Sequence, residues 1–72
     1  MKIKQSSSIA GYTIVLASSK LPDYFDSIAF DNVVAKVFPC YGYGENTFAV
    51  KGTYDLTGKT IEFLNKGKPV SI

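Results

Sequence analysis

The sequence predicts an all-β fold: a small antiparallel meander of five or six strands that forms a barrel or half-barrel. Apolar and polar residues alternate with a period of two, most clearly over residues 47–64, TFAVKGTYDLTGKTIEFL. The short runs are rich in β-branched and aromatic residues, and glycine, proline, asparagine and aspartate separate them, as expected for strands joined by turns. The alternative is an α+β fold with one helix near residues 22–37.

The first part of the chain predicts two strands. Residues 2–4 alternate and predict an edge strand that its lysines protect from pairing with other chains. The serine triplet after it is interpreted as a flexible joint or a bulge. Residues 9–17, IAGYTIVLA, are nearly all apolar, which favours a central strand covered on both faces. The more apolar side of this strand is formed by Tyr12, Ile14 and Leu16.

Two interpretations remain open for residues 22–38. The proline and aspartate at their start suit the first turn of a helix, and several apolar residues follow partial helical spacing. We prefer a strand over 27–30, a turn at Asp31-Asn32 and a strand over 33–38. The reason is that tyrosine, phenylalanine, serine and a Val-Val pair are mediocre helix formers.

Residues 47–64 predict one β-hairpin, around which the rest of the chain is arranged. Matching its apolar faces places Gly52 opposite Phe63, whose ring would cover the gap that glycine leaves. The same register sets Tyr54 opposite Ile61. It requires a loop with an even number of residues, two or four, and the glycine in that loop supplies the positive φ of a tight turn.

Two irregular segments complete the predicted organisation. Residues 39–46, PCYGYGEN, contain a proline and two glycines and predict the long loop that leads into the hairpin. Residues 65–69 predict a polar turn, and residues 70–72 a last edge pairing. The chain of 72 residues is expected to form one domain, residues 1–72, without a linker.

Composition excludes several classes of site. Cys40 is the single cysteine and there is no histidine, so an intramolecular disulfide, a Cys/His zinc site and a Ser-His or Cys-His catalytic pair are ruled out. A domain this small has a thin stability margin, and without these supports we expect self-association as a homo-oligomer to supply the missing burial. The formal net charge of +2, carried by lysines alone, is too small for a typical duplex-binding protein.

No catalytic residue, cofactor or metal ligand is predicted. The aspartates at positions 23, 26 and 31 lie close together in the sequence, but their spacing does not match a calcium-binding loop. Roles in turns and caps explain these carboxylates better. The chain is therefore expected not to be an enzyme.

The candidate partner-binding residues are Tyr41, Tyr43, Lys36 and Lys51. The two tyrosines flank a glycine in the predicted loop, and the lysines lie near them in the sequence together with Phe38. Three interpretations are open for these tyrosines. They plug the open end of the barrel, they anchor a protein partner, or they stack on single-stranded nucleic acid while the lysines neutralise phosphates.

The function expected from these features is that of a non-enzymatic, small protein-binding module. It would act as an accessory or inhibitory factor by occupying a partner's surface. The alternatives are single-stranded nucleic-acid binding on a small β-barrel and, third, an apolar-ligand carrier. No apolar run is long enough to cross a membrane, and a cytoplasmic location is favoured over export because polar residues 5–8 interrupt an otherwise signal-like start.

Overall fold

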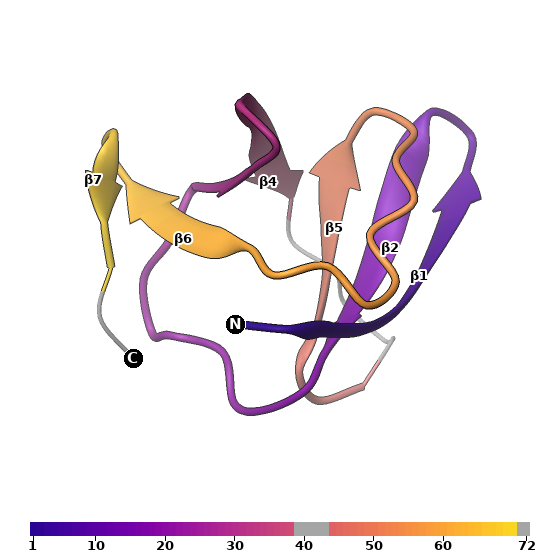
Figure 1. Cartoon of the computed structure of the whole chain (residues 1–72), viewed down its shortest axis with the longest axis horizontal. Helices are drawn as coiled ribbons and strands as arrows, with labels where there is room; N and C mark the ends of the chain where they lie inside the picture. Colours follow the sequence, from indigo (N-terminus) through magenta and orange to yellow (C-terminus); the bar gives the residue numbers. More distant parts are fainter. Residues whose placement is uncertain (39–43, 71–72) are drawn as a thin grey trace.

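A computed structural model describes residues 1–38 and 44–70, and these form a curved antiparallel sheet of seven strands (Figure 1). The strands are β1 (Ile3–Ile9), β2 (Tyr12–Ala17), β3 (Ser27–Phe30), β4 (Val33–Phe38), β5 (Thr47–Lys51), β6 (Glu62–Asn65) and β7 (Lys68–Pro69). Their order across the sheet is β1-β2-β5-β4-β3-β6-β7. The predicted all-β half-barrel is confirmed, and the alternative of a helix across residues 22–37 is wrong, since that segment contains β3 and most of β4.

The two ends of the sheet approach each other without a continuous ladder between them. Lys2 and Thr60 form an isolated antiparallel bridge. The backbone N–H of Ile3 donates to the carbonyl of Lys59 at 2.8 Å. In Figure 1 the start of β1 runs beside the stretch that enters β6, so the sheet is curled but not closed as a regular barrel.

Three hairpins have two-residue turns in which both central residues have positive φ. The pairs are Ala10-Gly11, Asp31-Asn32 and Lys66-Gly67, with φ of 51° and 82°, 48° and 63°, and 53° and 79°. Turns of this primed type match the right-handed twist of the strands that they join. The predicted strands over 27–30 and 33–38 and the turn between them are confirmed.

The prediction of one central strand over residues 9–17 is wrong. The turn at Ala10-Gly11 divides this segment and folds the serine-rich β1 back along β2, because both turn residues adopt the left-handed conformation. β2 is also fully buried on one face only, not covered on both faces as expected, and the buried face is not the more apolar one. Its buried side chains are Thr13, Val15 and Ala17, whereas Tyr12, Ile14 and Leu16 point outward.

The hairpin predicted over residues 47–64 does not exist, although its two strands do. β5 lies between β2 and β4, and β6 pairs with β3 and β7. Phe63 lies opposite Ile28 and not opposite Gly52. The ring that lies nearest to Gly52 is that of Tyr54. The predicted side-chain directions are confirmed, since Ile61 and Phe63 are buried while Lys51 is exposed.

The core fills the concave side of the sheet. Phe25, Phe48 and Phe63 pack edge to face, with ring centroids 4.7–5.9 Å apart. Phe25 comes from the segment between β2 and β3, and its ring packs against Phe48 of β5 and Phe63 of β6. The other buried members of the core are Ile3, Val15, Ile28, Phe30, Ala35, Val50, Leu56 and Ile61.

Serines of β1 hold the segment that connects β5 to β6. The hydroxyl of Ser6 accepts a hydrogen bond from the backbone N–H of Leu56 at 2.9 Å. The N–H of Ser6 donates to the hydroxyl of Thr57 at 3.1 Å. The serine triplet, predicted as a joint or bulge, is instead part of a regular strand, and the bulge lies earlier, between Ile3 and Gln5.

Candidate functional site

The convex side of β1, β2, β5 and β4 presents a surface that we call the outer face. Its side chains are the ones that alternation turns away from the core. The cross-strand register places them in rows, such as Ile14 beside Ala49 and Ala49 beside Phe38. The outer face is formed by Gln5, Ser7, Ile9, Tyr12, Ile14, Leu16, Val34, Lys36, Phe38, Thr47, Ala49 and Lys51.

Apolar side chains are unusually exposed on this surface. Ile9 is 62% exposed, Val34 64% and Tyr12 39%. The ring of Tyr12 meets that of Phe38 edge to face, with centroids 5.4 Å apart, so the two aromatic side chains bridge β5 from either side. Exposed apolar groups that lie together on one face are typical of a binding surface, whereas isolated ones are ordinary.

The two candidate lysines lie on the outer face and are both exposed. Val37 and Val50 are paired across β4 and β5, and Lys36 and Lys51 each follow directly beyond this last pair of the ladder. The ammonium group of Lys36 lies 5.9 Å from the centroid of the Phe38 ring. In the ladder between β2 and β5, Lys51 is paired with Tyr12.

No carboxylate occurs on the four strands of the outer face. β1, β2, β4 and β5 read IKQSSSI, YTIVLA, VVAKVF and TFAVK, and their charged residues are the lysines at positions 4, 36 and 51. The acidic residues belong to loops and to β6: Asp23, Asp26, Asp31, Glu45, Asp55 and Glu62. The outer face therefore combines apolar side chains with positive charge, while Asp26, directly before β3, lies near enough to Lys36 for the two charges to interact.

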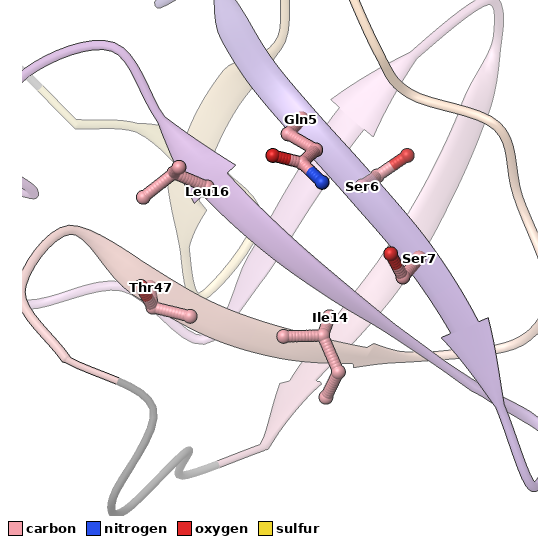
Figure 2. A pocket seen from close by; sticks show the side chains of 6 residues that line it. All are labelled: Gln5, Ser6, Ser7, Ile14, Leu16 and Thr47. Carbon is pink, nitrogen blue, oxygen red and sulfur yellow. The ribbon is translucent and has the colours of Figure 1, made fainter.

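A shallow hollow of about 130 Å³ lies on the outer face between β1 and β5 (Figure 2). Ile14 and Leu16 come from β2, Thr47 from β5, and Gln5, Ser6 and Ser7 from β1. Its walls are thus apolar in the middle and carry hydroxyl and amide groups at the sides. The hydroxyl of Ser6 is already engaged by the backbone of Leu56.

A second hollow, of about 500 Å³, lies at the end of β5 opposite Lys51. It is lined by Lys20, Leu21, Glu45 and Asn46. The lysine and the glutamate give it charge of both signs, and it opens widely to solvent. Nothing in this lining selects a ligand.

The acidic residues weighed from the sequence serve the fold. Asp26 accepts hydrogen bonds from the hydroxyl of Ser27 at 2.7 Å and from the backbone N–H of Lys66 at 3.0 Å. These two bonds, the Ser27 bond first, lower the pKa of the Asp26 carboxyl below its ordinary value of 3.8. Asp31 lies in a turn and forms an exposed ion pair with Lys59. In the part of the chain that is described, no three His, Cys, Asp or Glu residues are grouped so that they could hold a metal ion.

The partner-binding role predicted for Lys36 and Lys51 stays a prediction, and both side chains are exposed on the outer face. Tyr41 and Tyr43 lie outside the described residues. Tyr12, Ile14 and Leu16 were missed because an apolar run predicts core. The sequence did contain one signal: the glycine at position 11 allows a turn there, which frees one face of the following strand.

Comparisons with known proteins supply no relative. No protein-family model, no curated protein and no solved structure matches this chain. Within residues 1–38 and 44–70, no helix is long and apolar enough to span a membrane. The outer face is consequently the feature on which a proposal of function rests.

Proposed function

We propose that this protein is a non-enzymatic binding module whose outer face occupies the surface of a protein partner, as an accessory or inhibitory factor does. One observation carries the proposal: Ile9 and Tyr12, paired across β1 and β2, are exposed on a sheet face that also carries Val34, Lys36 and Lys51. Protein interfaces combine apolar and aromatic anchors with a charged rim in this way. A cytoplasmic location agrees with the single cysteine, which permits no internal disulfide.

The geometry favours a protein over a nucleic acid as the partner. Tyr12 and Phe38 meet edge to face, at an interplanar angle of 87°, and do not form two parallel platforms on which bases could stack. Ile9 and Val34 offer aliphatic surface, which a phosphate backbone does not use.

Single-stranded nucleic-acid binding remains the second candidate, because one observation favours it. Lys36 lies above the ring of Phe38, and aromatic rings interleaved with lysines are used to bind single strands. Its signature is affinity for an oligothymidylate that falls steeply with added salt. A carrier of apolar ligands is the third candidate, and it would require the packed rings of Phe25, Phe48 and Phe63 to separate.

The proposal is tested by affinity capture with matched tyrosine variants. Tyr12→Ser removes an aromatic anchor from the outer face, whereas Tyr24→Ser changes a tyrosine that is 77% exposed on the segment between β2 and β3. We expect a protein that is retained by the wild type and by Tyr24→Ser but lost by Tyr12→Ser. Identical capture by both variants, or no specific capture by the wild type, would contradict the proposal. Circular dichroism establishes that each variant is folded.

A further inference from the structure

Resting on the proposed function, we infer that the outer face binds a protein segment that presents one aliphatic or phenyl side chain to the hollow of Figure 2 and carboxylates to Lys36 and Lys51. The partner is thus assigned a chemistry, acidic and apolar together, and an orientation across the strands. The apolar group lies over β2 and the carboxylates lie over β4 and β5.

The charge distribution supports an acidic partner. Lys36 and Lys51 lie on adjacent strands, one residue beyond the paired Val37 and Val50, and like charges near one another destabilise a sheet. None of the four strands contributes a carboxylate that could compensate them. The Asp26 carboxylate interacts with Lys36 from beside β3, but its hydrogen bonds go to Ser27 and to the backbone of Lys66. A carboxylate from outside would relieve this repulsion at both lysines.

The same charges argue against a second copy of this chain as the occupant. A symmetric dimer whose axis passes near Lys36 and Lys51 would bring these lysines of each copy toward those of the other. Pairing through sheet edges is also disfavoured, because residues 57–59 bond to the backbone of Ile3 and Ser6 in β1 and because β7 is two residues long and ends at Pro69. The occupant is therefore a different molecule.

The hollow fits one side chain. A volume of about 130 Å³ is slightly smaller than an aliphatic cavity of about 150 Å³ that accepts benzene. Ile14 and Leu16 supply the apolar contact, and the polar groups of Ser7 and Thr47 lie at its rim. A leucine, isoleucine, valine or phenylalanine of the partner matches this size and lining.

The register also sets the spacing within the partner. Lys51 lies two residues along β5 from Ala49, the neighbour of Ile14, and four residues from Thr47. At about 3.3 Å per residue, the carboxylates should lie roughly 7–13 Å from the apolar group. This corresponds to two to four residues of an extended segment, or to one or two turns of a helix.

The test is selection from a displayed library of short random peptides on the immobilised protein. Lys36→Glu/Lys51→Glu is the variant used for counter-selection, and Lys20→Glu/Lys68→Glu, with the same change in net charge away from the outer face, is the matched control. We expect enriched peptides to combine Asp or Glu with an aliphatic or phenyl residue at the stated spacing. They should bind the control like the wild type and bind the counter-selection variant about tenfold or more weakly.

Further readouts separate the inference from the proposed function. Ser7→Leu fills the hollow and should abolish the preference for the apolar residue while Lys36 and Lys51 still select acids. Enriched peptides that lack acids but lose binding to Tyr12→Ser overturn the inference and leave the protein-binding function standing. No enrichment over the bare support, or displacement of the peptides by oligothymidylate, overturns both.

Discussion

The hydroxyl of Thr13 donates a hydrogen bond to the carbonyl of Gly52 at 2.8 Å. The Thr13 hydroxyl oxygen also accepts a hydrogen bond from the backbone N–H of Tyr54 at 3.0 Å. Thr13 is fully buried, so a single side chain replaces the ladder that β2 and β5 lose where the chain turns away at Gly52. This contact fixes the path of the segment that covers β1.

Thr13→Val should therefore destabilise the protein by about 2 kcal/mol, because it leaves two backbone groups without their partner. Thr13→Ser keeps the hydroxyl and loses a methyl group, so about 1 kcal/mol is expected. Urea unfolding followed by circular dichroism measures both. Equal stability of the two variants would contradict the role assigned to the hydroxyl.

Gly52 cannot be replaced by a residue with a side chain without strain. Its φ is +109°, and an added Cβ would lie 2.6 Å from the ring of Tyr54, which packs edge to face on Phe30. Gly52→Ala should cost about 2 kcal/mol or more. Gly58→Ala is the matched control, since its φ is +77° with nothing near the added atom, and about 1 kcal/mol is expected there. A smaller cost at Gly52 than at Gly58, from thermal unfolding, would refute this account.

Ala10 occupies a turn position that alanine tolerates poorly, with φ of 51°. Asparagine is preferred where both central residues of a hairpin turn have positive φ. Ala10→Asn should thus raise the stability by about 0.5–1 kcal/mol. Lys66→Asn, at φ of 53° in the turn before β7, should act in the same direction. Differential scanning calorimetry tests this, and a lower Tm for Ala10→Asn would contradict it.

Acid should remove the contribution of Asp26. Its folded pKa lies below the ordinary value of 3.8, so the ionised carboxyl stabilises the fold above that pH, and the contribution is lost as the pH falls through the folded pKa. Asp26→Asn should flatten this part of the pH dependence of the unfolding free energy below about pH 4. An unchanged profile in the variant would show that another carboxyl is responsible.

Lys51→Glu should separate binding from stability. It replaces a like-charged neighbour of Lys36 with an opposite charge, so the unfolding free energy should stay unchanged or rise by a few tenths of a kcal/mol. Binding of an acidic partner by the outer face should fall at the same time. Unfolding curves and peptide titrations on the same samples give both quantities, and a destabilised variant would contradict this prediction.

Alternation in the sequence predicted side-chain direction well and strand partners poorly. The strands over 27–30 and 33–38 were predictable because their turn residues, Asp31 and Asn32, lie directly between two apolar runs. The hairpin over 47–64 failed because Phe63 faces inward whether its neighbour is β5 or β3, so the pattern does not distinguish the two pairings.

The candidate site was half predictable for a related reason. Lys36 and Lys51 are charged residues within strands, so their outward direction follows from parity. The apolar residues of the outer face, Tyr12 and Ile14 among them, resemble core in sequence, and only the turn at Ala10-Gly11 sets them outside. The hydroxyl contacts of Ser6 and Thr13 join parts of the chain about 40 to 50 residues apart and leave no local signal.

The segment of residues 54–60 that contacts β1 has a consequence for how the chain folds during synthesis. During synthesis β1 and β2 leave the ribosome first, yet the residues that shield the edge of β1, from Tyr54 to Thr60, are made much later. Until then the hairpin of β1 and β2 leaves the outer edge of β1 without a partner, and the distant contacts that end this exposure form slowly. We therefore expect aggregation to be most favourable on crowded polysomes, before the segment from Tyr54 to Thr60 is made. Ser6 and Ser8 bond to this segment and so help to end the exposure of β1.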